Sequence, residues 1–200
     1  MLDYSIYAII ISISIVLIPI ITLLVRSLFN NPLLARRSVV KYKDQKVSND
    51  IIIKAVKMAI LAPNHFLSEP WRFYLCSDRV KNEIIKLNES KRELFKSVPY
   101  WMIVTMKSEH AMYEKLYFED HSACSCAVQN FMLSLASDGI GSKWVTGALG
   151  IKEVDILRTI DCGIAEKFIG IIWFGYPQEN LLSIPIPERK LGIKMFSILN

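Results

Sequence analysis

The sequence predicts an α+β fold, arranged as an α/β sandwich and preceded by one transmembrane helix. Three observations support this prediction. Helical patterns and apolar strand-like runs alternate along the chain from Arg36 onward. The 200 residues are 52% hydrophobic, which suffices for the core of one domain of ordinary size. Residues 4–25 carry no charged side chain. We therefore expect a membrane anchor in residues 1–27, a linker in 28–35 and one domain in 36–200.

The N-terminal segment has the length and composition of a membrane span. A helix over residues 4–25, at 1.5 Å per residue, would be about 33 Å long. A cleaved signal peptide and a buried core helix are the alternatives, but no Lys or Arg precedes the segment and it shows no polar stripe. Arg26, Arg36 and Arg37 follow it, so the positive-inside rule predicts a single-pass protein with its catalytic domain on the cytoplasmic side.

Periodicity and turn signals predict the elements of the domain. Ser48 caps a helix over 49–62 that ends at Pro63, with Ile53, Val56 and Ile60 expected on its buried face. A polar, helix-prone stretch over 81–95 breaks near residue 88. A long helix over 122–137 has one apolar stripe, and another helix covers 152–160. Strand-like runs occupy 72–77, 100–106 and 168–177, the last apolar enough for a central strand covered on both faces. The longest helix places Ala127, Phe131 and Leu135 on its stripe.

Composition excludes several classes of function. The formal net charge is +5, but the basic residues are scattered among acidic ones and form no stripe for nucleic acid. Four cysteines are too few and too irregularly spaced for a disulfide framework or a zinc site, so no metal is expected. Common nucleotide-binding and hydrolase motifs do not occur, and three histidines lie in no recognisable spacing. We therefore expect no nucleic-acid partner and no hydrolase chemistry.

One short cluster could bind an anion. Arg36, Arg37 and Ser38 place two cations beside a hydroxyl, where charge-assisted hydrogen bonds could hold a phosphate dianion. Two arginines shortly after a membrane span are also common as determinants of topology. Taken alone, the pair leaves both interpretations open.

Further blocks resemble the nitroreductase family. After R-R-S comes a helix ending in A-P, then a loop with P-x-H that closes on E-P-W and a strand. CAVQNFMLSLASDGIGSKWVTGAL is similar to the family's central dimer helix and its G-x-G-x-x-W turn, and FIGIIWFGYPQE to its last core strand. These blocks cover roughly residues 34–179 in the family order, and the match is closest to the small single-domain bacterial branch. The resemblance implies a mixed sheet flanked by helices.

The resemblance also implies a cofactor and a set of binding residues. It implies a homodimer with FMN at the subunit interface, reduced by NADH or NADPH and reoxidised by a nitroaromatic, quinone or similar acceptor in a ping-pong mechanism. The cofactor would do the redox chemistry, so no catalytic side chain is assigned. The phosphate and ribityl chain would contact Arg36, Arg37, Ser38 and Arg189, with Lys190 as a second choice for the last. The ring would contact His65 and Glu69, and the partner subunit would contribute Trp144, Val145, Thr146 and Gly147.

Two departures from the family pattern leave alternatives open. Val40 stands where many members have a further Arg, with Lys41 beside it, which leaves a non-catalytic flavin-binding membrane protein as one alternative. E-P-W with an N-terminal anchor also occurs in the iodotyrosine deiodinase branch, a reductive dehalogenase. The substrate-covering lid of that branch is not identifiable in residues 107–122, so a general reductase is the favoured interpretation. Trp71 and Trp144 are better explained as packing residues than as catalytic ones.

Overall fold

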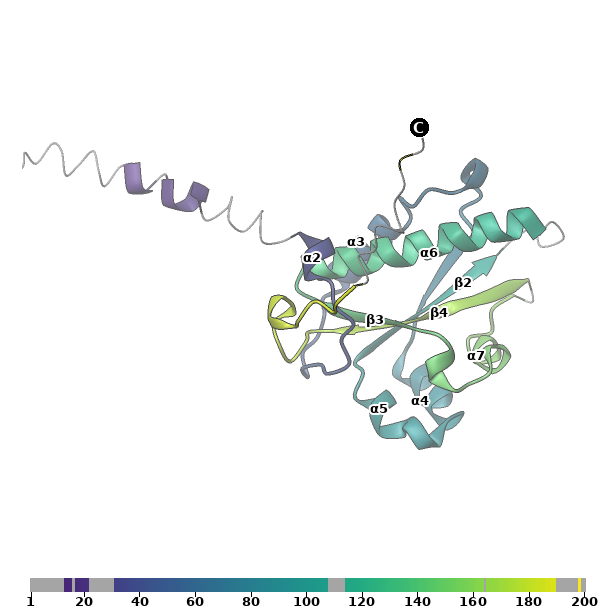
Figure 1. The fold of residues 1–200 in the computed structure, drawn as a ribbon. Helices are drawn as coiled ribbons and strands as arrows, with labels where there is room; N and C mark the ends of the chain where they lie inside the picture. The colour runs from purple at the N-terminus through teal and green to yellow at the C-terminus, as the bar shows by residue number, and fades with distance from the viewer. Residues whose placement is uncertain are drawn as a thin grey trace, which may run out of the picture.

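The computed structural model describes residues 13–15, 17–21, 31–107, 114–163, 165–189 and 198. Its core is one antiparallel sheet of four strands in the order β1-β2-β4-β3 (Figure 1). The strands are β1 (Trp71–Leu75), β2 (Tyr100–Lys107), β3 (Gly141–Val145) and β4 (Glu166–Gly175). The predicted mixed sheet is therefore wrong for the described residues. All three strand pairs are antiparallel, and the parallel contact is an isolated bridge between Ser38 and Ser142.

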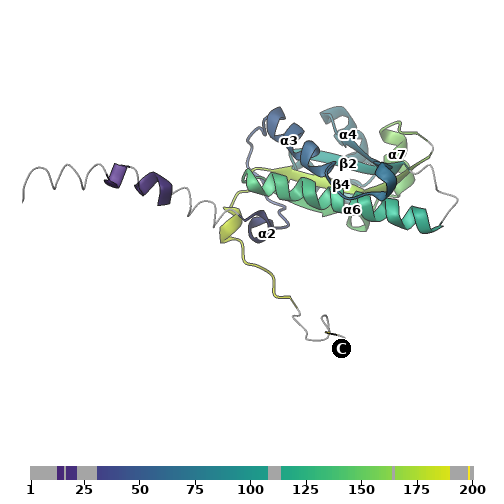
Figure 2. The same ribbon diagram turned by 90° about the horizontal axis from the view of Figure 1, so that it is seen from above.

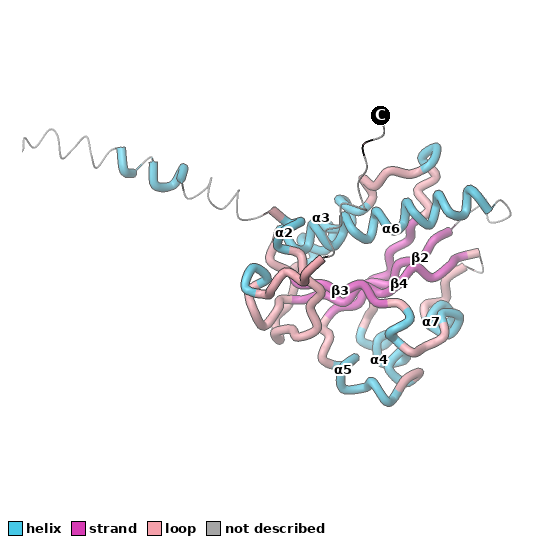
Figure 3. The backbone as a smooth tube through the Cα atoms, in the orientation of Figure 1, coloured by secondary structure: helices cyan, strands magenta, loops and turns pink. Residues whose placement is uncertain are grey.

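Helices cover both faces of this sheet. On one face lie α3 (Asn49–Ala59) and α6 (Glu114–Ser137); on the other lie α4 (Asp78–Lys86), α5 (Arg92–Lys96) and α7 (Glu153–Thr159) (Figures 1 and 3). Seen from above, α6 runs along the length of the sheet (Figure 2). A short helix, α2 (Pro32–Ala35), packs at the C-terminal end of α6.

The two central strands are apolar because each of their faces meets a helical layer. Along β2, Met102 and Val104 join the core beneath α3 and α6, whereas Trp101 and Ile103 join the core beneath α4, α5 and α7. Strand β4 alternates in the same way. Side chains of a strand point to opposite faces in turn, so a strand covered on both sides needs apolar residues at every position. The predicted central strand is confirmed.

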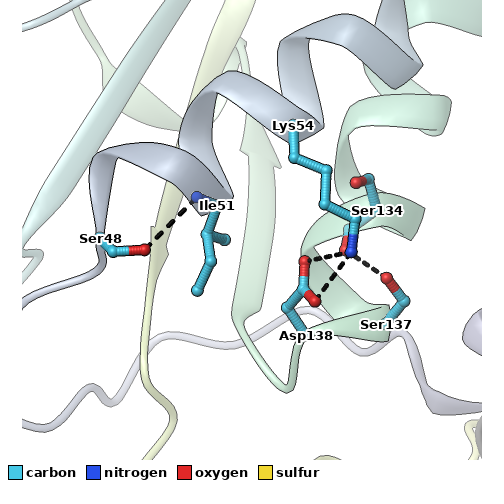
Figure 4. Close-up of polar contacts among 6 residues, drawn as sticks. All are labelled: Ser48, Ile51, Lys54, Ser134, Ser137 and Asp138. Atoms are coloured by element: carbon cyan, nitrogen blue, oxygen red, sulfur yellow. Dashed lines mark hydrogen bonds and ion pairs between the residues drawn. The ribbon is translucent and has the colours of Figure 1, made fainter.

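Close contact between α3 and α6 corrects one expectation. The cap at Ser48 is confirmed, since its side chain accepts from the Ile51 N–H, and Lys54 pairs with Asp138 beyond the end of α6 at 2.9 Å (Figure 4). The buried face, however, consists of Ile52, Ala55 and Ala59, and Ile53 and Ile60 are exposed. Small residues allow the two helices to approach closely, which larger side chains on that face would prevent.

The stripe predicted on α6 is confirmed, because Ala127, Phe131 and Leu135 are all fully buried. The helix begins eight residues before the predicted start at residue 122. Strand β3 was not predicted, since its sequence GSKWV lies between glycines and is too short to show a clear alternation.

The predicted membrane localisation is contradicted. Residues 13–15 and 17–21 are helical, and the remainder of the predicted anchor, residues 1–27, lies outside the described residues. A helix needs about 20 consecutive apolar residues to cross the hydrocarbon core. Within the described part of the chain, no helix combines that length with that apolarity. A single-pass protein with its domain on the cytoplasmic side is therefore not upheld.

Candidate functional site

Three arginines gather at one cavity beside α2. The cavity has a volume of about 340 Å³ and is lined by Leu33, Arg36, Arg37, Ser38, Ile184, Pro185, Ile186, Pro187 and Arg189. None of these residues carries a carboxylate. Burial lowers the pKa of Arg36 from its usual value, and the neighbouring charges of Arg37 and Arg189 lower it further. Positive charges that line a cavity in which no carboxylate takes part are stabilised by a bound anion, so the cavity suits a phosphate group.

The two adjacent arginines differ in role. The Arg37 side chain is buried and donates to backbone oxygens: Nε to Ile184 at 3.0 Å and Nη1 to Leu34 at 2.5 Å and to Arg36 at 2.9 Å. It therefore ties α2 to the segment at Ile184. Because these bonds occupy Arg37, the half-buried Arg36 is the guanidinium better placed to meet a ligand. Lys190, the second choice to Arg189, lies outside the described residues.

Ser38 connects this cavity to strand β3. It forms a bridge with Ser142, and the Val39 N–H donates to the Ser142 carbonyl at 3.1 Å. Gly141 allows this approach, since a Cβ there would lie 2.8 Å from a Val39 methyl carbon. The Ser142 hydroxyl is buried and has no hydrogen-bond partner among the described residues. The sequence did not single out Ser142, because nothing in a Gly-Ser pair distinguishes a site from a turn.

The segment predicted to cover the cofactor continues from the same strand. Val145 ends β3 and is buried, whereas Thr146 and Gly147 are exposed at the turn that follows. Within one protomer, this turn lies within five residues of Ser142, the residue that pairs with Ser38.

Trp144 is held by packing. Its indole N–H donates to the Ile169 carbonyl at 3.2 Å, and its ring lies against Gly170. A Cβ at Gly170 would come within 2.1 Å of the indole nitrogen. The structure therefore gives Trp144 a structural contact that fixes β3 on β4.

The predicted P-x-H loop lies elsewhere. His65 is exposed, and its Nδ1 lies 3.1 Å from a carboxylate oxygen of Glu119 near the start of α6. Glu69 is also exposed, and its N–H donates to the Asn64 side chain at 3.0 Å. Phe66, Leu67 and Glu69 all have positive φ, a conformation that costs non-glycine residues energy. Strain of this kind is concentrated at binding sites, which is consistent with a functional loop.

The loop and α2, the short helix beside the arginine cavity, lie towards opposite ends of α6 (Figure 1). Glu119 contacts the loop, whereas Ala136 lines a cavity together with Ala35, the last residue of α2. Those two positions are 17 residues apart, which corresponds to about 25 Å of helix. One chain therefore brings together Arg36, Ser38 and the turn after β3, but not His65 or Glu69.

Comparison with known proteins gives consistent matches. The model of the nitroreductase family matches residues 33–116 and 86–176. A Bacillus subtilis protein named provisionally as an NAD(P)H nitroreductase is 30% identical over 162 residues, covering 72% of this chain and 82% of that protein.

Solved structures share the fold. A nitroreductase-like family protein from Bacillus cereus is 24% identical, covers 84% of this chain and 94% of its own, and has a TM-score of 0.71. A provisionally named nitroreductase from Desulfovibrio desulfuricans, solved in complex with FMN, is 20% identical, covers 84% of this chain and 95% of its own, and also has a TM-score of 0.71.

Proposed function

Because this chain belongs to the nitroreductase family, we propose that it is an FMN-dependent oxidoreductase that takes electrons from NADH or NADPH. Its acceptors are nitroaromatic compounds, quinones or similar small molecules. The observation that carries the proposal is the carboxylate-free cavity formed by Arg36, Arg37 and Arg189 beside β3. The Bacillus subtilis relative and the FMN-bound structure of the same fold support it.

The residues present fit FMN. Arg36 and Arg189 hold the phosphate by charge, and Ser38, which lines the same cavity, offers a neutral hydrogen bond next to it. When bound, FMN supplies the redox chemistry, in a ping-pong exchange in which the nicotinamide leaves before the acceptor enters. Thr146 and Gly147 form the exposed turn that contacts the ring system, and Gly147 has open space where a side chain would stand.

A second copy of the chain completes the site. The resemblance led us to expect Trp144 to Gly147 from the partner subunit, but within one protomer this segment follows directly from Ser142, which pairs with Ser38. Within one chain, the loop with His65 and Glu69 lies far from the arginine cavity. We therefore propose a homodimer in which α6 packs against its symmetry mate, so that each loop reaches the arginine cavity of the other protomer.

Exposed apolar side chains on this face support the dimer. Met58 of α3 and Leu61, just beyond its C-terminal end, line an open, largely apolar cavity with Leu133 of α6. Leu61 is 69% exposed, and Phe118 on α6 is 59% exposed. Apolar groups gathered on one face are typical of a surface that another protein covers.

The role of Arg36 is tested by FMN binding. Replacing Arg36 with Gln removes the charge and should weaken FMN binding by at least about tenfold, the effect of one lost charged hydrogen bond. Arg158→Gln is the matched control, because Arg158 is exposed on α7 and pairs with Asp155. Fluorescence titration of FMN measures both. Equal affinity in the Arg36 and Arg158 variants would contradict the assignment.

The arrangement of the dimer is tested by mixing subunits. Arg36→Gln and a loop variant, His65→Ala with Glu69→Ala, are each expected to have low NAD(P)H oxidation activity as homodimers. If each loop serves the partner's cavity, a heterodimer of the two variants has one site with both elements intact. Activity should then recover to about half that of the wild type. No recovery in an isolated heterodimer would place the loop and the cavity of one site on the same protomer.

A further inference from the structure

The turn after β3 is held by two side chains from the segment that joins α4 to α5. Asn88 follows α4, and its amide donates to the carbonyl of Leu149 at 2.9 Å and to that of Gly150 at 3.4 Å. The Lys91 ammonium donates to the carbonyl of Ala148. Three consecutive carbonyls of one turn are thus bound by two side chains that lie three residues apart.

The donors are themselves fixed in place. The Ser90 hydroxyl donates to the Asn88 amide oxygen at 2.6 Å, which leaves the amide nitrogen facing the turn. The Lys91 N–H donates to the Asn88 carbonyl at 3.2 Å. Asn88 and Lys91 are both half-buried, and the bond from Asn88 to the Leu149 carbonyl is partly shielded from water, which strengthens it.

The turn accommodates both donors closely. Gly150 has φ +66°, and a Cβ there would lie 2.9 Å from the Asn88 amide nitrogen and 3.5 Å from the Lys91 ammonium. Inside the turn, the Leu149 N–H donates to the Thr146 carbonyl at 3.0 Å, and the Gly150 N–H donates to the Gly147 carbonyl at 3.1 Å. Leu149 is buried in the core beneath α4 and α5. The turn is therefore anchored on its inner side, and Thr146 and Gly147 are left exposed on its outer side.

From this arrangement we propose that Asn88 and Lys91 are positioning residues for the flavin. They fix the turn whose Thr146 and Gly147 contact the ring system, and Lys91 also brings a positive charge to that edge of the site. The inference rests on the proposed function. It goes beyond it because neither residue lines the arginine cavity and neither belongs to a segment expected to touch the cofactor.

The affinity and spectroscopic properties of bound FMN should change when either side chain is removed. Lys91→Met and Asn88→Ala should each weaken FMN binding about tenfold, since each removes a side-chain anchor of the contacting turn. Lys91→Met should also make the reduction potential of the bound flavin more negative, because a nearby cation favours the more anionic reduced form. Both variants should alter the visible circular dichroism of bound FMN.

Arg92→Met is the matched control. It removes one positive charge from the same helical layer, but Arg92 is exposed and its side chain contacts Glu89. This variant should keep the affinity, potential and dichroism of the wild type. Thermal unfolding of each flavin-free variant separates an effect on folding from an effect on the site.

Three results would overturn the inference. Affinity within twofold of the wild type, with unchanged potential and dichroism, would show that the turn needs neither anchor. Reduced stability of the flavin-free protein, with an unchanged potential and dichroism once FMN is saturating, would assign Asn88 and Lys91 to folding alone. Equal shifts in the Arg92 variant would assign the effect to general charge. In these cases wild-type protein still binds and reduces FMN, whereas its failure to do so would refute the proposed function itself.

Discussion

Replacing Gly170 with Ala should be among the most destabilising single changes of the sheet. Gly170 lies in β4 with φ +151°, a conformation that residues with a side chain rarely adopt. The new methyl group would lie 2.1 Å from the Trp144 indole nitrogen, 2.7 Å from its neighbouring carbon and 3.1 Å from the Val145 carbonyl oxygen. The indole must then move and release its hydrogen bond to Ile169.

Two costs add at this position. The backbone conformation costs a non-glycine residue about 1–3 kcal/mol, and forcing an extra methyl into a packed contact costs about 1–3 kcal/mol more. We expect Gly170→Ala to lower the free energy of unfolding by about 3 kcal/mol. Because Trp144 and Val145 lead directly into the turn with Thr146 and Gly147, FMN binding should weaken as well.

Urea unfolding of four proteins separates the two costs: wild type, Gly170→Ala, Trp144→Leu and the double variant. Leucine removes the ring that the methyl group meets, so Gly170→Ala should cost at least about 1.5 kcal/mol less in the Trp144→Leu background. Gly163→Ala is the control, since no atom lies within 4 Å of a Cβ there, and it should change stability by less than about 0.5 kcal/mol. Equal costs of Gly170→Ala in both backgrounds would refute the proposed contact.

Two further predictions concern titratable groups in the core. Burial raises the pKa of Tyr42 above its usual value, so its stabilising effect is complete below about pH 10 and is lost as the pH rises further. Tyr42→Phe should therefore reduce the loss of stability above about pH 10. At neutral pH it should lower the free energy of unfolding by about 1 kcal/mol, because the hydrogen bond to the Val39 carbonyl is lost. Urea unfolding at neutral and at alkaline pH measures both effects, and an equal loss of stability above about pH 10 in wild type and variant would contradict the prediction. Burial also raises the pKa of the Cys76 and Cys124 thiols to about 12, so neither should react with iodoacetamide near pH 8 until urea unfolds the protein. Mass spectrometry of labelled peptides measures this, and labelling of Cys124 in the native protein would contradict it.

The sequence predicted elements whose own periodicity is strong. The stripe of Ala127, Phe131 and Leu135 and the central strand β4 depend on local patterns of apolar residues, and both are confirmed. The buried face of α3 was predicted one residue off because the larger Ile53 and Ile60 were favoured over Ala55 and Ala59. Which side of a helix is buried depends on how closely its neighbour approaches, and that distance is a tertiary property.

Site residues were predicted as members of a motif, whereas their roles depend on distant partners. Arg36 and Arg37 are identical in type and adjacent, yet Arg37 is occupied by backbone carbonyls that include Ile184, 147 residues away. Asn88 and Lys91 were part of a polar helical stretch, and only the fold brings them to the turn at Leu149. A sequence pattern carries no signal for a side chain that acts on the backbone of another segment.

Anaerobic reduction of the bound flavin tests the central claim most directly. Purified protein saturated with FMN and freed of excess should retain one FMN per chain. Addition of NADH or NADPH without oxygen should bleach its visible absorbance within the mixing time or shortly after. Restoration of the absorbance by a quinone or a nitroaromatic compound would complete the predicted cycle. Protein that holds FMN but is reduced by neither nicotinamide would contradict an oxidoreductase and favour a non-catalytic flavin-binding protein, and protein that retains no FMN would contradict the account altogether.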